Sequence, residues 1–369
     1  MSPGLYIHVP FCRSKCPYCA FYSIPSPSLI PLWWEGLKEE IILYRDRFDP
    51  FDTLYVGGGT PTSLDPGMLK RLMGYLLSHL KATRDPEVTV EANPQDLTRE
   101  MIAALKGSGV NRVNVGVQSF DDGVLSLLGR NHRAEDGARA IEGLRRAGFG
   151  NMGIDLIYGI EGQDLKAWLK TLGTALSFQP EHISCYELTF ERKTPFARLR
   201  EEGRIAPMGE SEATAFFLET SGRLEDAGYI HYEISNFARG EGYFSRHNQK
   251  YWHHVPYLGL GPSAHSFQDG RRWWNLRSIR GYFSAAKEGR PPVEGREDLT
   301  REQLRMETLA TGLRTKAGVH MALIRELPGW AGAVSGLQAS GLVKVLEDRL
   351  IPTKRGFLVA DQIPLAFFQ

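Results

Sequence analysis

Six short apolar segments, each followed by a stretch with helical spacing, constrain the fold of this 369-residue chain more than any other feature. Strands that alternate with helices form a parallel sheet covered by helices. The arrangement is then either a barrel, closed or partial, or a doubly wound sheet, and the residue types do not choose between them. The predicted strands span residues 5–9, 53–56, 88–92, 113–117, 154–158 and 183–188.

Residues that are unusual in buried strands gather at or just beyond the carboxyl ends of these segments. A cysteine run at 12–19 follows the first segment, and a glycine run with Thr60 follows the second. Glu91, Gln118 and Asp155 stand near the ends of the next three. Barrel enzymes place their chemistry at this end of the sheet. We therefore expect the functional site there.

The pattern loosens after about residue 190 and predicts three parts in the chain. Residues 213–228 have helical spacing, whereas 237–267 are rich in Gly, His and aromatics and predict an irregular wall over the sheet opening. From Leu299, helical patterns precede two alternating segments around Glu347 and Asp348, as in a small winged-helix module. The predicted parts are residues 1–235, 236–295 and 296–369.

Charge and hydropathy patterning exclude several kinds of partner. Lys and Arg number 44 against 43 Asp and Glu, so no charge surplus favours nucleic acid as a partner or an anionic membrane as the main one. The first residues lack the basic start and apolar stretch of a signal peptide, and no run of about 18 apolar residues occurs. We expect a cytoplasmic protein without a transmembrane segment. Peripheral contact with a membrane is compatible with this sequence.

Three of the four cysteines stand at C-x3-C-x2-C spacing, at Cys12, Cys16 and Cys19. Short spacings let one loop place three thiolates at three corners of a [4Fe-4S] cluster. The fourth iron then lacks a protein ligand, and the amino and carboxylate groups of S-adenosylmethionine can chelate it. Electron transfer from such a cluster splits a carbon–sulfur bond of that ligand and yields a 5′-deoxyadenosyl radical.

Other interpretations of the cysteines remain open. A zinc site completed by His8 or Cys185 is one, and three unliganded buried thiols are another. Zinc knuckles favour two C-x2-C pairs, and the run contains one such pair. Cys185 itself is predicted to be buried strand packing.

The glycine run and the polar strand ends also have two interpretations each. Glycines 57–59 allow a ligand close to the backbone, or they form a tight turn. Glu91 lies in an otherwise apolar strand and needs a cationic or hydrogen-bonding partner. For Gln118, Arg130 and Asp155, an internal salt bridge or a helix cap is the alternative to a ligand contact.

The chain resembles the oxygen-independent coproporphyrinogen III oxidase-like proteins of the radical S-adenosylmethionine superfamily. The resemblance rests on Tyr-Ile-His-Val-Pro-Phe-Cys at 6–12, Gly-Gly-Gly-Thr-Pro-Thr at 57–62, Glu-Ala-Asn-Pro at 91–94, Gly-Val-Gln-Ser-Phe at 116–120 and Ile-Asp-Leu-Ile-Tyr-Gly at 154–159. It implies an α/β fold, a partial (β/α)6 barrel. It also implies S-adenosylmethionine binding by Tyr6, Tyr18, Gly58, Gly59, Thr60, Glu91, Gln118, Arg130 and Asp155.

Two departures separate the chain from the decarboxylating oxidase. That enzyme has a further Cys two residues after the third cluster ligand, where this chain has Phe21, and it has an N-terminal extension. The chain resembles instead the heme chaperone branch of the family, which carries His-Asn-x-x-Tyr-Trp, here at 247–252. Members of that branch bind heme and deliver it to respiratory hemoproteins.

The candidate heme residues are His247, Tyr251 and Trp252, because imidazole can ligate iron and aromatic rings offer apolar faces. A structural loop with a hydrogen-bonded His is the alternative. We therefore expect a heme chaperone with a [4Fe-4S] cluster, S-adenosylmethionine, and flavodoxin or ferredoxin as electron donor. The alternative functions are conversion of coproporphyrinogen III to protoporphyrinogen IX, which the departures disfavour, another radical reaction on a tetrapyrrole, or a zinc-stabilised binding module.

Overall fold

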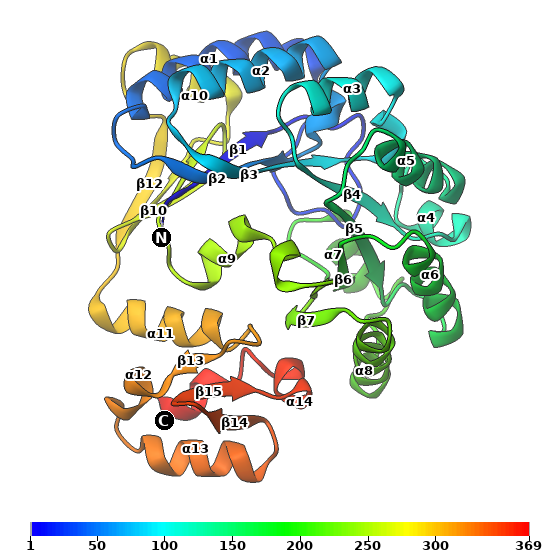
Figure 1. The fold of residues 1–369 in the computed structure, drawn as a ribbon, viewed down its shortest axis with the longest axis vertical. Coiled ribbons are helices and arrows are strands. Elements are labelled where there is room, and N and C mark those ends of the chain that lie inside the picture. Colours follow the sequence, from blue (N-terminus) through cyan, green and yellow to red (C-terminus); the bar gives the residue numbers. More distant parts are fainter. Residues whose placement is uncertain (1, 369) are drawn as a thin grey trace.

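A single curved sheet of twelve strands organises the protein, in a computed structural model that describes residues 2–368 (Figure 1). The spatial order is β12-β11-β10-β9-β1-β2-β3-β4-β5-β6-β8-β7. The strands are β1 Gly4–Val9, β2 Phe51–Gly58, β3 Ala82–Ala92, β4 Arg112–Gln118, β5 Met152–Tyr158, β6 His182–Glu187, β7 Ile230–Glu233, β8 Asn236–Ala238, β9 Tyr257–Leu260, β10 His265–Gln268, β11 Arg271–Asn275 and β12 Val293–Asp298.

Strands β1 to β6 lie side by side in chain order and pair in parallel, which identifies a barrel-like arrangement. A doubly wound sheet would reverse direction at a switch point. Within residues 2–368 no pairing joins β7 to β12, so the sheet forms an open arc. The expectation of a partial barrel is confirmed, and the six predicted strands correspond to β1–β6.

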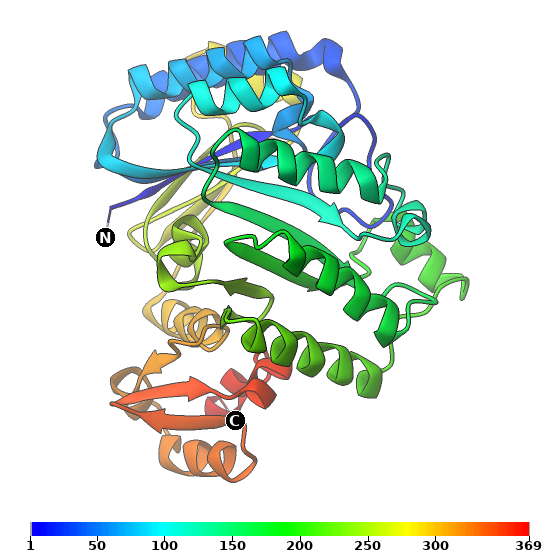
Figure 2. The same cartoon turned by 45° about the vertical axis from the view of Figure 1, so that its right-hand side comes forward.

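Helices cover the outer face of this arc. They are α1 Ile30–Tyr44, α2 Pro66–His79, α3 Arg99–Gly107, α5 Ala134–Arg146, α6 Leu165–Ser177, α8 Glu210–Asp226 and α10 Ile279–Lys287. Two further helices, α4 Asp122–Leu127 and α7 Pro195–Glu201, lie at the rim, where Val124 and Phe196 share a small apolar cluster and Phe196 N donates to Pro17 O at 3.1 Å. Figures 1 and 2 show α3, α5, α6 and α8 following one another around the outside. Alternation along each strand explains this, since Leu5, Ile7 and Val9 of β1 enter the main core, and Tyr6 and His8 face the other side.

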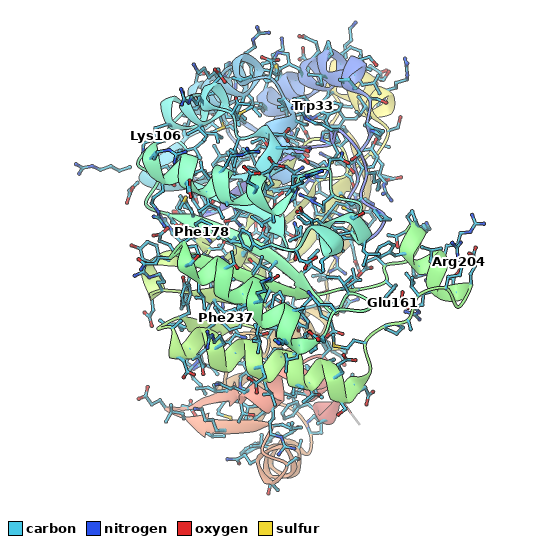
Figure 3. The ribbon with its side chains drawn as sticks, turned by 90° about the vertical axis from the view of Figure 1, so that its right-hand side faces the viewer. Trp33, Lys106, Glu161, Phe178, Arg204 and Phe237 are labelled. Atoms are coloured by element: carbon cyan, nitrogen blue, oxygen red, sulfur yellow. The ribbon has the colours of Figure 1, made fainter. Side chains whose placement is uncertain are left out.

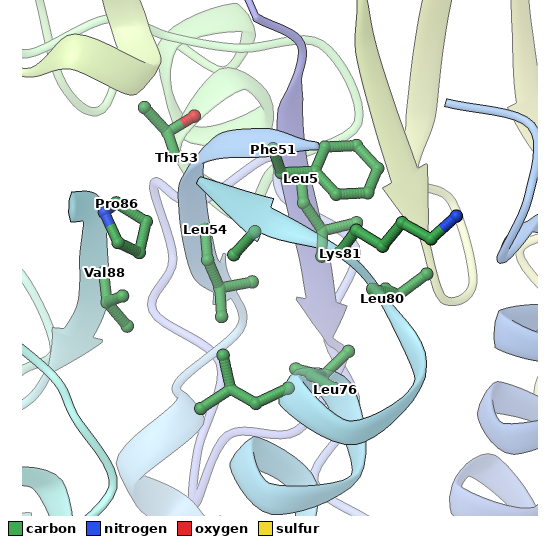
Figure 4. A pocket seen from close by; sticks show the side chains of 11 residues that line it. Leu5, Phe51, Thr53, Leu54, Leu76, Leu80, Lys81, Pro86 and Val88 are labelled. Carbon is green, nitrogen blue, oxygen red and sulfur yellow. The ribbon is translucent and has the colours of Figure 1, made fainter. Parts of the chain in front are cut away.

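The two edges of the barrel carry different loops. In Figure 3, Lys106 and Phe178, near the carboxyl ends of α3 and α6, lie on one side, and Glu161 and Arg204 lie on the other. Glu161 follows β5, so the carboxyl ends of the strands face that second side. A small apolar pocket between α2 and the first halves of β1–β3 is lined by Leu5, Leu54 and Val88 (Figure 4). Core side chains form the wall of this pocket, and it lies away from the cysteine loop.

Regular elements occupy the stretch 237–267, where the sequence predicts an irregular wall, and they continue through the predicted middle part 236–295. The segment contains β8 to β12, α10 and the helix α9 Arg246–Trp252. Strand β9 pairs in parallel with β1, from Gly4 opposite Tyr257 to Ile7 opposite Leu260. Strands this short, paired with a partner far away in the sequence, leave little local periodicity. The predicted division of the chain into three parts stays a prediction.

A second, smaller core lies at the carboxyl end. It is built on Leu309, Leu313, Ile324 and Leu350, and its sheet has the order β13-β15-β14. The elements are α11 Arg301–Gly312, β13 Val319–His320, α12 Met321–Arg325, α13 Trp330–Ala339, β14 Val343–Leu346, β15 Arg349–Pro352 and α14 Lys354–Leu358. The turn between β14 and β15 has positive φ at Glu347 and Asp348, as two-residue hairpin turns require. The predicted terminal hairpin is confirmed.

Candidate cluster and ligand site

The cysteine run forms a closed loop at the carboxyl end of β1. Phe11 and Ile24 pair at its base, where Ile24 N donates to Pro10 O at 2.8 Å and Cys12 N donates to Ile24 O at 3.2 Å. All three thiols are half-buried and free of disulfides. Because one short loop carries them, they share one small volume at the rim of the barrel.

The glycine run lies along this loop. Gly59 N donates to Val9 O at 2.8 Å, and Thr60 N donates to Phe11 O at 2.7 Å. A Cβ at position 59 would stand 2.6 Å from Phe11 O, so only glycine allows this approach. Thr60 Oγ1 thereby comes within 3.4 Å of Cys12 Sγ. The run is a turn that also holds the cysteine loop.

Arg130 connects the cysteines to the ends of neighbouring strands. Its guanidinium donates to Asn93 Oδ1 at 2.6 Å, to Gly116 O at 2.8 Å and to Cys16 Sγ at 3.6 Å. Asn93 in turn donates to Thr60 Oγ1 at 3.1 Å. A continuous chain of polar contacts therefore joins Cys16 to Cys12.

Glu91 and Asp155 lie on the inner face of the barrel near this chain. Burial raises the pKa of Glu91 to about 7, although Tyr55 Oη and Gly58 N both donate to its carboxylate, at 2.7 and 3.1 Å. Burial likewise raises the pKa of Asp155 to about 6, and its Oδ1 has no hydrogen-bond partner within residues 2–368. Neither carboxylate pairs with a cation in the described chain. Both can therefore accept a cationic or hydroxyl-bearing ligand.

His8 is engaged by the protein at both ring nitrogens. Its Nδ1 lies 2.9 Å from Tyr6 Oη and its Nε2 lies 2.8 Å from Tyr22 O. Cys185 is buried on β6 in the main core. Among residues 2–368 no three His, Cys, Asp or Glu side chains are arranged to hold a single metal ion. The zinc interpretation through His8 or Cys185 stays a prediction.

Gln118 has an unusual backbone conformation that the sequence did not indicate. Its φ is 67°, in the left-handed region, and the pairing of β4 with β5 is irregular between Val115 and Gln118. Non-glycine residues held in this region concentrate at functional sites. The side chain is thereby turned toward Gly116, where a Cβ would stand 2.8 Å from its Nε2.

Three further residues belong to this site and were missed by sequence reasoning. Asn93 joins Arg130 to Thr60, and Arg13 pairs with the buried Asp96 at 2.7 Å, which ties the cysteine loop to the end of β3. The signal for Asn93 was the polar pair Asn-Pro directly after a strand. A lone Arg in a loop gives no such signal, because its partner lies about 80 residues away.

The candidate heme residues lie elsewhere, on α9, which closes the inner face at the amino ends of β1–β3 (Figure 1). His247 is buried, with Nδ1 2.8 Å from Thr53 Oγ1 and Nε2 2.9 Å from Tyr251 Oη. Burial lowers its pKa to about 3. Trp252 is half-buried beneath the guanidinium of Arg314. Tyr6 joins this group to the predicted S-adenosylmethionine residues, because its ring centroid lies 6.4 Å from that of His247.

Comparisons with known proteins fit this geometry. The model of the Radical SAM superfamily matches residues 6–175. The chain is 36% identical to the heme chaperone HemW of Bacillus subtilis over 98% of both chains. It is 34% identical to the heme chaperone HemW of Synechocystis, over 87% of this chain and 80% of that one.

Among solved structures, coproporphyrinogen III oxidase (HemN) from Escherichia coli superposes with a TM-score of 0.84. It covers 99% of this chain and 90% of its own at 24% identity, and this likeness is one of fold. The parallel sheet and the cysteine loop at its rim define a radical S-adenosylmethionine protein. Within that superfamily, the chain belongs to the family of the heme chaperone HemW.

No helix within residues 2–368 is long and apolar enough to cross a membrane.

Proposed function

We propose that the protein binds heme and transfers it to apoproteins, and that Cys12, Cys16 and Cys19 hold a [4Fe-4S] cluster that binds S-adenosylmethionine. The observation that carries the proposal is the similarity to a heme chaperone along 98% of both chains. Respiratory hemoproteins are the proposed recipients, in the cytoplasm or at the membrane surface. A flavodoxin or ferredoxin is the proposed electron donor.

The residues at the rim fit such a cluster. Three half-buried thiols on one closed loop provide three soft ligands, and Arg130 supplies a positive charge beside Cys16. When bound, the cluster supplies an electron for reductive cleavage of S-adenosylmethionine. Thr60 and Asn93 orient the loop around it through their contacts with Cys12 and Arg130.

The inner face beside the loop offers contacts for S-adenosylmethionine. Glu91 and Asp155 can receive its positive charge and its hydroxyl groups, since neither has a cationic partner in residues 2–368. Tyr6, Tyr18 and the amide groups of Gly58 and Gly59 complete the proposed set, with Thr60, Gln118 and Arg130. These residues come from β1 to β5 and from the loops that follow the strands, so the site requires the intact arc.

The test is anaerobic reconstitution of the wild type and Cys16→Ser with iron and sulfide. The wild type should bind about four irons per chain and cleave S-adenosylmethionine under reduction, whereas Cys16→Ser should lose most of both. Cys185→Ser is the matched control, because Cys185 is buried on β6 and should leave the iron content unchanged. Equal iron content in the Cys16→Ser variant would sink the cluster assignment.

The heme part is tested on the same preparations by hemin titration and by transfer to an apo-hemoprotein. A saturable Soret change and loss of heme to the acceptor are expected. The competing oxidase activity would instead give protoporphyrinogen IX from coproporphyrinogen III during anaerobic turnover. Turnover without heme transfer would reverse the assignment in favour of the oxidase.

A further inference from the structure

The inner face of the sheet continues beyond β1 onto β9, β10 and β11. Gly259 of β9 pairs with Tyr6 of β1, and Trp274 of β11 pairs with His265 of β10. Trp273 points to the opposite face, where its ring stacks on Tyr44 of α1 at a centroid distance of 6.4 Å. Because neighbouring residues on a strand face opposite sides, Trp274 and His265 face the inside of the arc.

His265 is exposed on this inner face, next to Trp274. Its ring stacks on Trp274 with centroids 6.0 Å apart and planes 26° apart. Trp274 lies across Gly295 of β12, where any Cβ would collide with the indole. Within residues 2–368 neither ring nitrogen of His265 has a hydrogen-bond partner. Partial burial of the ring lowers the pKa of His265, and nearby Arg272 adds to this effect.

Two other histidines on the inner face differ in this respect, and a third, His182, is buried and has one ring nitrogen bonded to Tyr232 Oη at 2.7 Å. His8 and His247 each have both ring nitrogens engaged by protein atoms, and both are buried. An engaged, buried imidazole has to break two hydrogen bonds before it can bind a metal. His265 therefore differs from them in being exposed and in having both ring nitrogens free within residues 2–368.

Positive charge and aromatic surface stand close to His265. The segments that carry His265 and the exposed Arg277 are joined, because Ser263 N donates to Leu276 O at 3.1 Å and Asn275 N donates to Ala264 O at 2.9 Å. The guanidinium of Arg277 lies 5.3 Å from the ring of Tyr22 and has no ion pair within residues 2–368. Phe21, next in the chain, is 69% exposed. This surface joins the cysteine loop to β10.

We propose that His265 is an axial ligand of the bound heme, and that Arg277 pairs with one of its propionates. The inference rests on the proposed heme binding and names the site for it. Heme needs an axial donor for iron, apolar contact for its macrocycle and cations for its two carboxylates. The axial donor is the imidazole of His265, and the apolar contact is the exposed ring of Phe21. The cation for one carboxylate is the guanidinium of Arg277, which has no ion pair within residues 2–368.

The test is hemin titration of the wild type, His265→Ala and the control His320→Ala, whose exposed imidazole lies in the carboxyl-terminal module. His265→Ala should weaken hemin binding at least about tenfold, or about 1.4 kcal/mol. It should also lose the electron paramagnetic resonance signature of imidazole-ligated iron, and added imidazole should restore that signature in His265→Gly. His320→Ala should behave as the wild type.

The propionate contact has its own measurement. Arg277→Gln should weaken the binding of hemin and leave the binding of hemin dimethyl ester, which lacks the carboxylates, unchanged. If the wild type shows no saturable Soret change, heme binding itself fails. If the wild type binds hemin and His265→Ala binds it with the same affinity and spectrum, only the ligand assignment is overturned. Loss of ligation in His247→Ala alone would move the site to α9.

Discussion

At the scale of single residues, Glu91 shows that burial inside a binding site disfavours the ionised form of a carboxyl group. The raised pKa means that the folded protein holds a proton on Glu91 between about pH 4.5 and 7, where the unfolded chain has lost it. In that window the contribution of Glu91 to the free energy of unfolding falls as the pH rises. A bound cation lowers the pKa of Glu91 again, because it favours the ionised form of the carboxyl group.

We therefore expect S-adenosylmethionine to bind the reconstituted protein about tenfold more tightly at about pH 8 than at about pH 6. The ligand needs ionised Glu91, and the ionised fraction of that carboxyl falls about tenfold for each pH unit below its pKa. Glu91→Gln should bind weakly at both pH values. Calorimetric titration measures both. Glu161→Gln, an exposed loop change, is the control, and a Glu91→Gln variant that keeps the pH dependence would contradict the role of Glu91.

Two glycines should respond in opposite ways to substitution by alanine. Gly58 has φ 108°, and a Cβ there would meet His8 Nδ1 at 2.5 Å, whereas Gly74 is exposed on α2 with no atom within 4 Å. Gly58→Ala should lower the free energy of unfolding by about 1–3 kcal/mol, and Gly74→Ala should raise it by about 0.5–1 kcal/mol. Urea denaturation of both variants measures this, and equal midpoints would contradict it.

At the scale of secondary-structure elements, α9 is the part whose role changed most between sequence and structure. The motif at 247–252 indicated a heme-binding loop, and the structure has a short helix whose first amides donate to the buried carboxylate of Glu87, at 3.2 and 3.1 Å. His247 then stacks on Tyr55 at 5.1 Å. Assignment of heme contacts to α9 stays a prediction, and its packing role is visible in these contacts.

His247→Phe should keep the stacking on Tyr55 but leave the buried hydroxyl of Thr53 without a partner. A cost of about 1–3 kcal/mol in the free energy of unfolding is expected, since an unsatisfied buried donor loses its hydration as well. His253→Phe, at the exposed end of the same helix, should cost little. Denaturant titration of both variants checks the difference, and an unchanged His247→Phe midpoint would refute the packing role.

At the scale of the whole molecule, local signals predicted what local sequence encodes. Residues 5–9 and 154–158 alternate or run apolar, and they are strands β1 and β5; the cysteine spacing predicted a single loop. The pairing of β9 with β1 could not be predicted, because its four residues acquire strand geometry only through a distant partner. The left-handed conformation of Gln118 could not be predicted either, because it depends on the irregular pairing of β4 with β5.

Buried ionisable groups predict that acid destabilises the whole protein. Burial lowers the pKa of His8, His132, His182, His231 and His247 below 6.5, so the unfolded state takes up protons there first as the pH falls. Glu40, Glu91 and Asp155, with pKa values raised to about 7, 7 and 6, act in the opposite sense. Burial also lowers the pKa of three more histidines and raises that of three more carboxyls, and these two additions act against each other; they are His253, His254 and His265, and Asp96, Glu187 and Glu233. Five histidines against three carboxyls therefore leave a net loss of stability on acidification.

The free energy of unfolding should fall by roughly 2–3 kcal/mol per pH unit between about pH 6 and 5, which is two net protons at 1.4 kcal/mol each. Urea denaturation across that range is the measurement. His231→Gln, which removes one of the five groups, should flatten the slope by about one proton. A midpoint independent of pH would contradict the balance.

The pairing of β1 with β9 has a consequence for synthesis on the ribosome. Strand β1 carries the cysteine loop, yet one of its edges stays open until about 250 further residues have been translated. An open strand edge in a nascent chain is prone to wrong pairing, and distant contacts form slowly. The cysteines therefore emerge long before the sheet that positions them is complete, so iron–sulfur loading should follow release of the finished chain.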